Sequence, residues 1–366
     1  MSLINNYGPE SSPIWILLDV PYDNDSDNGT ILSGGYGYNF KKIWKIAGLS
    51  LSDIYIKSLR PCLGASYIKE NVLSNLLGDI NHHKPTFVVP LSDEIINYLV
   101  PATTQAKEKN SSLGKWAGSL LTSNYINYPH YIIGSQPPDV ITRNWDQSEI
   151  QAFIHFGHVR EEFEYWKKYG TINPLPIRYL LCEPFYPDLI AYLNDCLNCL
   201  YIGSDIETIR PKKGSTYYGV NCGYPYCVSL AKSAKDAVSF SLWDYTPEQC
   251  LIIWRLLDKI YSTIPQIGQN YFLFDAHYLE AMGWRVCLNK CKDTLIRHHI
   301  LWPSLRHSLQ FQTLQYTREP FYKDEGKNFN IKRKKQYMAY NAKDSCVTVE
   351  IFEEQEKEFN ERPNLR

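Results

Sequence analysis

The chain has 366 residues, of which 44% are hydrophobic and 21% charged, and its formal net charge is −1. This composition excludes a coiled coil or a long disordered protein, and at about 150 residues per domain the length predicts two domains. No stretch approaches the ~18 uninterrupted apolar residues that cross a bilayer, and the N-terminus lacks the basic-then-apolar pattern of a secretory signal. We therefore expect a cytoplasmic protein with no membrane partner, whose ten scattered cysteines are free thiols.

The first part of the chain alternates short apolar runs with helical spacing. Residues 14–18, 54–56, 86–89 and 131–133 are typical of buried strands, and residues 40–47 have the spacing of a helix that ends at Gly48. Strands that alternate with helices indicate a parallel or mixed sheet in an α/β domain.

A proline-spaced stretch at residues 173–187 follows a predicted helix at 158–168 and marks the domain boundary. Beyond it the sequence predicts a strand at residues 200–206 and a hairpin at 217–230 with turn residues Asn221, Gly223 and Pro225. Helices are predicted from Thr246 onward, so the second region is also α/β. The predicted organisation is a first domain at 1–165, a linker with a lead-in helix at 166–199 and a second domain at 200–366.

Three acidic segments in the second region carry the clearest functional signal. Asp205 and Glu207 alternate along a predicted strand, so their carboxylates face the same way. Asp275 follows a polar turn and an aromatic-rich stretch, while Tyr340 and Asp344 are four residues apart on one face of a predicted helix. Carboxylates held together repel one another unless a cation binds them, and their hard oxygen atoms favour Mg²⁺ or Mn²⁺.

In this order the segments resemble the motifs of the DEDDy 3′→5′ proofreading exonuclease domains of phage-type family A DNA polymerases. Asp205 to Glu207 is similar to the D-x-E motif, Asn270 to Asp275 to N-x3-F-D, and Tyr340 to Asp344 to Y-x3-D. A single motif would more often belong to a solvated strand edge or a surface helix, whereas three in order indicate the family. Further similar segments lie at residues 293–296, 298–303 and 317–325, so the resemblance covers about residues 200–360.

The resemblance implies an RNase H-like (DEDD) fold and a metal-dependent 3′→5′ DNA exonuclease that releases 5′-mononucleotides by two-metal hydrolysis. Two Mg²⁺ or Mn²⁺ ions would bind the carboxylates, and Tyr340 would orient the attacking water. The implied catalytic residues are Asp205, Glu207, Asp275, Tyr340 and Asp344. The implied substrate-binding residues are Thr208, Asn270, Tyr271, Phe274 and Tyr337, of which Phe274 also suits a core position.

The expected substrate is a single-stranded or frayed 3′ end of DNA. A basic run at residues 332–335 would grip its backbone or, alternatively, form a solvated helix start. The resembling polymerases continue from the third motif into a thumb and a polymerase domain, whereas this chain ends about one helix after Asp344. We therefore expect a DNA polymerase partner, in trans or formerly fused, and the host cell cytoplasm as location if the chain is phage-encoded.

Residues 10–145 resemble the uracil-DNA glycosylase superfamily, which implies an α/β/α domain. The similar segments are a Gly-rich loop with its helix, a following strand and the later closing strands, at residues 29–37, 40–48, 53–62, 115–119 and 131–143. Iron–sulfur members need four cysteines in this domain, and only Cys62 is present, so no cluster is expected.

The catalytic positions of that superfamily are altered here. Its first motif reads G-E-A-P-G or G-Q-D-P-Y, whereas this chain reads L-D-V-P-Y from Leu18 to Tyr22. Its second motif carries His-Pro, where this chain has Gln136-Pro137, and a neutral amide cannot become a cation. We therefore expect a catalytically inactive platform for DNA or a partner protein. The degenerate site comprises Asp19, Pro21, Tyr22, Gln136 and Pro137.

Four cysteines could surround a zinc ion, although buried free thiols are commoner and zinc is not expected. They are Cys196, Cys199, Cys222 and Cys227. Three alternatives to a DNA exonuclease stay open on the sequence. They are an RNA-trimming exonuclease on the same fold, a DNA- or polymerase-binding module with secondary trimming activity, and a uracil-excision enzyme.

Overall fold

A computed structural model describes residues 5–22, 25, 29–60, 69–100, 113–143, 145–209, 224–326 and 333–365. The chain divides into two compact units, Met1–Leu175 with Arg318–Phe321, and Pro176–Thr317 with Tyr322–Arg366. Within the described part, none of the helices combines the length and apolarity that crossing a membrane requires.

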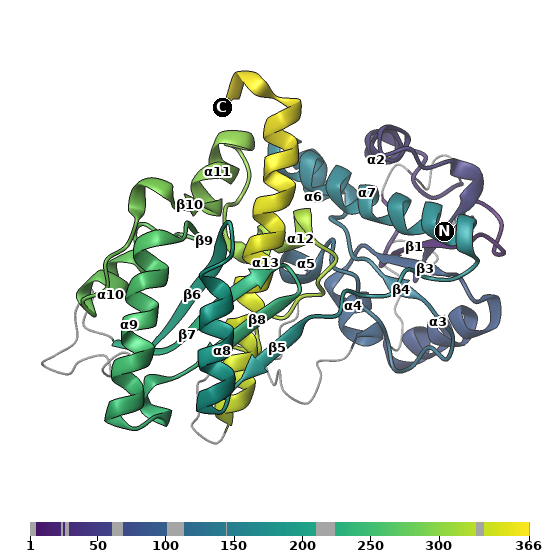
Figure 1. The fold of residues 1–366 in the computed structure, drawn as a ribbon. Helices are drawn as coiled ribbons and strands as arrows, with labels where there is room; N and C mark the ends of the chain where they lie inside the picture. The colour runs from purple at the N-terminus through teal and green to yellow at the C-terminus, as the bar shows by residue number, and fades with distance from the viewer. Residues whose placement is uncertain are drawn as a thin grey trace, which may run out of the picture. The chain divides into compact units, whose positions relative to one another are not determined.

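The first unit contains a four-stranded parallel sheet in the order β2-β1-β3-β4, of which Figure 1 labels β1, β3 and β4. All four strands lie at predicted positions, and β1 is buried along its whole length, as expected for a parallel strand covered on both faces. The strands are β1 (Ile14–Leu18), β2 (Ile54–Ser58), β3 (Phe87–Pro90) and β4 (Tyr131–Ile132).

Helices cover both faces of this sheet, which confirms the α/β/α layering without testing the glycosylase resemblance. One core contains side chains of α2 (Gly35–Ile46), α6 (Pro138–Arg143) and α7 (Trp145–Tyr169). The other contains side chains of α3 (Lys69–His83), α4 (Asp93–Leu99) and α5 (Leu113–Trp116). Helix α7 begins thirteen residues before its predicted start at residue 158 (158 − 145), and α2 also begins earlier than predicted.

The second unit contains a six-stranded sheet in the order β10-β9-β6-β7-β8-β5. Only β7 is antiparallel to its neighbours, an arrangement consistent with an RNase H-like fold. The strands are β5 (Tyr179–Cys182), β6 (Ile202–Ile209), β7 (Tyr224–Ser233), β8 (Asp236–Phe240), β9 (Gln266–Gly268) and β10 (Lys292–Asp293).

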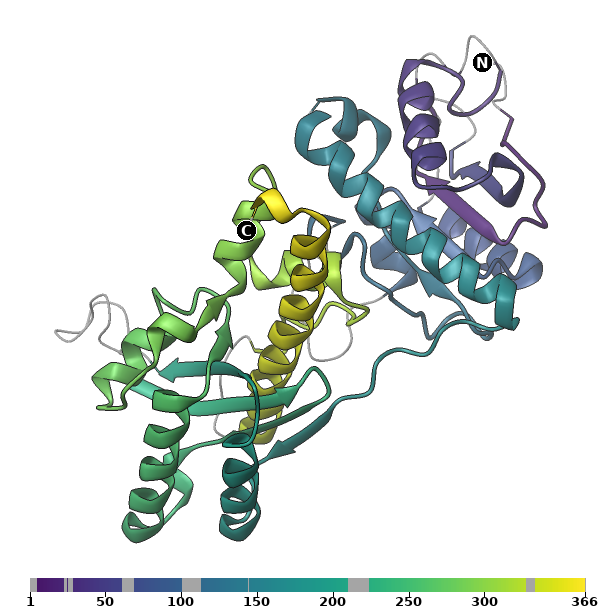
Figure 2. The same ribbon diagram turned by 45° about the horizontal axis from the view of Figure 1, so that its top comes forward.

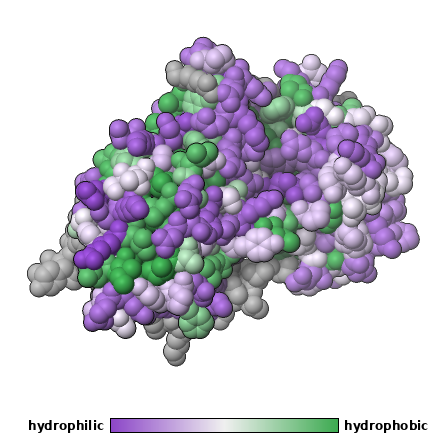
Figure 3. Space-filling model, viewed as in Figure 1, coloured by the Kyte–Doolittle hydropathy of each residue, from purple (hydrophilic) through white to green (hydrophobic). Residues whose placement is uncertain are grey.

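The two faces of this sheet have different covers, which Figure 2 shows from a second direction. Helices α8 (Tyr186–Cys196) and α9 (Pro247–Thr263) bury their apolar faces against one side, and the long helix α13 (Lys334–Glu361) lies on the other. Leu251 and Ile252 of α9 remain exposed. Figure 3 shows apolar side chains gathered on one face of the molecule.

Several boundaries differ from the predictions. The predicted linker at residues 166–199 contains β5 as well as the expected helix α8, and both belong to the second unit. Pro225 was predicted in a turn but lies within β7, paired with Thr208, next to a β-bulge that accommodates it. The rest of the predicted hairpin turn, including Asn221 and Gly223, falls outside the described residues.

Candidate active site

The candidate site lies where α13 crosses β6. Strand alternation directs Asp205 and Glu207 to the face that α13 covers, and Asp344 meets them from the helix. One carboxylate oxygen from each residue lies within 4.8 Å of the others, and no second group of three His, Cys, Asp or Glu side chains in the described chain is as compact. The structure therefore brings three of the predicted catalytic residues together.

Gly203 permits this close crossing. A Cβ atom at Gly203 would lie 2.6 Å from the backbone oxygen of Ser345 and 2.7 Å from Val349 on α13. Such distances are well below van der Waals contact, so any larger residue would push the helix away from the strand. The glycine thus sets the distance between the two elements that carry the carboxylates.

A buried hydrogen-bond network also fixes α13 on the sheet. The Asn341 amide donates to Asp205 Oδ2 at 2.6 Å and accepts from the Ser239 hydroxyl at 2.8 Å. The Ser229 hydroxyl donates to the Asn341 carbonyl at 3.0 Å and lies 2.5 Å from the Ser345 hydroxyl. Asn341 is completely buried, so these bonds orient the Asp205 carboxylate with little freedom.

Asp275 joins the site from the other side of β6. It is the first residue of α10 (Asp275–Ala281), is buried, and accepts the Ile206 backbone N–H at 3.0 Å. The loop before α10 is held by Asp293, the N-cap of α11 (Thr294–Leu301), which accepts the Asn270 backbone N–H at 2.9 Å. Asn270 itself has a positive φ of 58°, so this loop depends on a residue that tolerates the left-handed region.

Two residues that the motifs do not include complete the cluster. Lys323 Nζ donates to Asp344 Oδ2 at 2.5 Å and to the Tyr340 hydroxyl at 2.9 Å. The Tyr322 hydroxyl donates to the other Asp344 oxygen at 2.5 Å. Both belong to residues 317–325, a segment noted for its resemblance but given no site role, because its contact with Asp344 leaves no local sequence pattern.

The crowding of carboxylates changes their acidity. Burial raises the pKa of Asp205, and repulsion from Asp275, Asp344 and Glu207 adds to that shift. Burial also raises the pKa of Asp275. Burial and repulsion from Asp344 raise the pKa of Glu207 from 4.5 to about 7, against the opposing effects of Tyr337 and Lys323. A proton or a cation is therefore needed to relieve this site near neutral pH.

Two tyrosines of α13 border the carboxylates. The Tyr337 hydroxyl donates to Glu207 Oε2 at 2.8 Å, which supports that carboxylate directly. Burial and the nearby Asp344 raise the pKa of Tyr340 above its usual value, so its hydroxyl stays protonated. A Cβ atom at Gly326 would lie 2.4 Å from the Tyr340 ring, so the backbone there packs tightly on the ring.

The donor set fits a divalent metal ion. Asp205, Glu207 and Asp344 offer hard oxygen atoms within bridging reach of one another, with Asp275 behind them. Binding Mg²⁺ or Mn²⁺ would relieve the repulsion that raises the carboxylate pKa values. The identity and number of ions remain predictions.

The predicted substrate residues have different fates. Tyr271 was predicted to bind substrate, but it is completely buried and its hydroxyl donates to Gln266 at 3.1 Å, so that prediction is wrong. Phe274 packs its half-buried ring against Tyr278 in the same core, whereas Leu273 beside it is 82% exposed. Roles in substrate binding for Thr208, Asn270 and Tyr337 stay predictions.

The basic run before α13 is partly engaged with acidic residues. Lys334 forms ion pairs with Asp244 and Glu183, while Arg333 and Lys335 are exposed and Lys332 lies outside the described residues. Of the cysteines considered for zinc, Cys222 also lies outside them. Cys196, the last residue of α8, lies in the core shared with α9, whereas Cys227 packs under α13 on the other face of the sheet.

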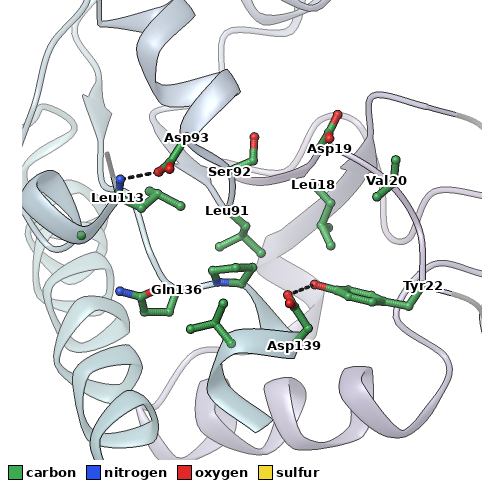
Figure 4. Close-up of a pocket in the computed structure, with 13 residues that line it drawn as sticks. Leu18, Asp19, Val20, Tyr22, Leu91, Ser92, Asp93, Leu113, Gln136 and Asp139 are labelled. Carbon is green, nitrogen blue, oxygen red and sulfur yellow. Dashed lines mark hydrogen bonds between the residues drawn. The ribbon is translucent and has the colours of Figure 1, made fainter. Parts of the chain in front are cut away.

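A separate cavity of about 430 Å³ lies in the first unit at the carboxyl ends of β1 and β3 (Figure 4). In the strand order, the connection from β1 leads to one side, to β2, and the connection from β3 leads to the other, to β4. Such a point between two strands is a common ligand site in open α/β sheets. Four of the five residues of the predicted degenerate site line the cavity, and Pro21 is buried beside it. The four lining residues are Asp19, Tyr22, Gln136 and Pro137.

The carboxylates of this cavity already have partners. Asp19 accepts two hydrogen bonds from Arg60 at 2.6 and 3.2 Å. Asp139 accepts the Tyr22 hydroxyl at 3.0 Å, and Asp93 accepts the Leu113 N–H at 2.5 Å. Each of the three carboxylates therefore has a hydrogen-bond partner within the unit.

The chain matches no protein-family model and no curated protein. Among solved structures, the Nibbler EXO domain of Aedes aegypti is 15% identical with a TM-score of 0.40, over 52% of this chain and 93% of that one. Escherichia coli RNase D, an exoribonuclease involved in structured RNA processing, is 14% identical with a TM-score of 0.36, over 52% of this chain and 50% of RNase D. The POL domain of Pol1 from M. smegmatis, in complex with DNA, is 15% identical with a TM-score of 0.37, over 50% of this chain and 28% of the Pol1 chain. The chain thus spans about half of RNase D.

The raised pKa of Glu207 predicts an unusual pH dependence of stability. Its pKa in the folded protein, about 7, exceeds its ordinary 4.5, so the folded state holds the proton more strongly between these values. Without metal, this group's stabilising contribution is therefore lost as pH rises through that window. Relative to Glu207→Gln, the native protein should lose on the order of 2 kcal/mol from about pH 5 to about pH 8 by chemical denaturation.

Mg²⁺ should reverse this sign, because metal binds the ionised carboxylates and its affinity rises with pH. Identical pH profiles for native protein and Glu207→Gln, with and without Mg²⁺, would contradict the assignment.

Lys323 should stabilise the metal-free site and oppose metal binding. Lys323→Met leaves Asp344 without its cation, so the free energy of unfolding without metal should fall by roughly 1–3 kcal/mol, a buried-pair value reduced for partial exposure. The rise in melting temperature on adding Mn²⁺ should become larger than in the native protein. Lys343→Met is the matched control, because Lys343 pairs with Glu325 at 3.1 Å. Equal effects of the two substitutions would argue against a special role for Lys323.

The partnered carboxylates of the first unit predict that uracil excision is absent. The intact protein should create no alkali-sensitive sites in uracil-containing DNA, assayed on gels in EDTA to suppress metal-dependent cleavage. Alkali-sensitive breaks that disappear in Asp19→Asn would instead assign an active glycosylase to this cavity.

Proposed function

We propose that the protein is a metal-dependent 3′→5′ DNA exonuclease that releases 5′-mononucleotides. The observation that carries the proposal is the meeting of Asp205, Glu207 and Asp344 within 4.8 Å, with Asp275 and Tyr340 adjoining them. The sequence motifs independently assign these five positions to one reaction. Divalent ions at such a cluster would supply a nucleophile at neutral pH and stabilise charge on the transferred phosphoryl group.

The chain's own residues would then bind and orient. Asp205, held by Asn341, and Glu207, held by Tyr337, would present fixed oxygen ligands rather than mobile ones. Tyr340, which stays protonated, would donate a hydrogen bond to the attacking water or to a phosphate oxygen. Lys323 lies within reach of Asp344 and Tyr340, where its charge would also attract the substrate phosphate.

The biological role that fits best is proofreading for a DNA polymerase, which would be a separate chain or a missing part of a longer one. The support is the resemblance of residues 200–360 to exonuclease portions of phage-type polymerases. In this proposal the first unit acts as a binding platform for DNA or for the polymerase. Removal of residues 1–165 would then weaken DNA or polymerase binding.

The first assay is digestion of a 5′-labelled single-stranded DNA with Mg²⁺, compared with RNA of the same sequence. We expect a ladder that shortens from the 3′ end of the DNA, with weaker cleavage of RNA. The Asp205→Ala/Glu207→Ala variant should lose more than about a hundredfold in rate, because both ligands are removed.

Digestion that survives in the variant would place the activity outside this site. No digestion by the native protein with either Mg²⁺ or Mn²⁺ would overturn the exonuclease proposal and favour a binding module. Preferential cleavage of RNA would replace DNA as the substrate.

A further inference from the structure

An exposed aromatic pair lies at one end of the second sheet. Trp243 is 72% and Tyr224 45% exposed, and their ring centroids are 5.8 Å apart. Tyr224 begins β7, and Trp243 lies in a short 3-10 turn, η2 (Leu242–Asp244), directly after β8. Aromatic rings usually bury most of their area, so two adjacent exposed rings have surface available for a ligand.

A β-bulge turns this pair toward the carboxylates. Glu207 pairs with Cys227 and Thr208 with Pro225, so Tyr226 is the extra residue of β7. The bulge shifts the alternation of side chains and places Tyr224 opposite Ile209, on the face that Glu207 occupies. At about 3.3 Å per residue, Tyr224 lies roughly 7 Å along the sheet from Glu207.

Further aromatic rings lead from this end toward the site. Tyr226 and Tyr337 have ring centroids 6.3 Å apart, and Tyr337 and Tyr340 are stacked with centroids 6.4 Å apart. These three rings are nearly buried, in contrast to Trp243 and Tyr224. Tyr226 lies two residues after Tyr224 in β7, so the exposed pair and the buried rings that reach the candidate catalytic tyrosine lie at the same end of this strand.

The turn that carries Trp243 is held firmly although its ring is exposed. The Ser241 hydroxyl accepts the Trp243 N–H at 3.4 Å and donates to the Tyr226 carbonyl at 2.6 Å. Asp244 in the same turn forms an ion pair with Lys334 at the start of α13. Arg333 and Lys335 flank Lys334 in the sequence and are exposed, so two further cations lie within one residue of the ion pair that anchors this turn.

Resting on the exonuclease function proposed above, we propose that Trp243 and Tyr224 form an outer base-stacking platform for the single strand whose 3′ end enters the carboxylate site. Unpaired bases stack on aromatic faces whatever their sequence, and nearby cations attract the phosphates between them. A protein partner would use the apolar faces but would not need the adjoining positive charge. Paired bases in a duplex do not offer free faces, so the platform favours single strands.

The test measures binding without cleavage. Fluorescence anisotropy is recorded in EDTA with the Asp205→Ala/Glu207→Ala protein and labelled thymidine oligonucleotides of two and about ten residues. Adding Trp243→Ala should weaken binding of the longer DNA by roughly 10- to 100-fold, leave the dinucleotide unchanged, and be largely rescued by Trp243→Phe. Uridine oligonucleotides of the same length should show the same loss, because stacking does not read the sugar.

Tyr179→Ala is the matched control, because Tyr179 is equally exposed at 72% but lies at the opposite end of the β8–β5 pair. Melting temperatures should be unchanged in all variants. Equal losses for Tyr179→Ala and Trp243→Ala, or no loss for Trp243→Ala, would overturn the platform. Loss of polymerase binding with unchanged oligonucleotide affinity would overturn it in favour of protein docking. None of these outcomes depends on catalysis, so they are distinct from failure of the exonuclease assay.

Discussion

Mutual repulsion among closely spaced carboxylates is the interaction on which the second unit depends. Asp205, Glu207 and Asp344 place oxygen atoms within 4.8 Å of one another, an arrangement that the fold must oppose with fixed contacts. Gly203 brings α13 onto β6, and the Asn341 network holds the two elements in register. Packing and hydrogen bonds elsewhere along α13 therefore stabilise the crossing of α13 and β6. The repulsion among the carboxylates offsets part of this stabilisation.

That repulsion also explains why a lysine lies in the cluster. Lys323 contacts Asp344 and lowers the free energy of ionising Glu207. Without metal, some of the carboxylates can therefore stay ionised. The same charge opposes metal ions. The site therefore has two states: in one, protons and Lys323 balance the carboxylates, and in the other a metal ion does. A substrate phosphate would favour the metal-bound state, because it would offer Lys323 another partner.

The sequence could predict the faces that carry the carboxylates, because the periods of strand and helix fix them for Asp205, Glu207 and Asp344. It could not predict Lys323 or Tyr322, since their contacts depend on the path of a segment with no regular period. Tyr271 was misjudged because an aromatic residue beside a motif looks the same whether it faces substrate or core. Strands β9 and β10 have only three and two residues, too short to show alternation.

The acidic residues of the two units differ in whether hydrogen bonds and ion pairs within the unit balance their charge. In the first unit, Asp19 is paired with Arg60 and Asp93 with a backbone N–H, so the cavity is electrostatically satisfied. In the second, burial and, after it, repulsion from Asp344 raise the pKa of Glu207 to about 7. A fold keeps such unfavourable local electrostatics where a ligand compensates for it. The first unit has the geometry of a ligand site whose charges are balanced internally, whereas the second holds carboxylates that Lys323 balances only in part, so protons or a bound cation must relieve the rest.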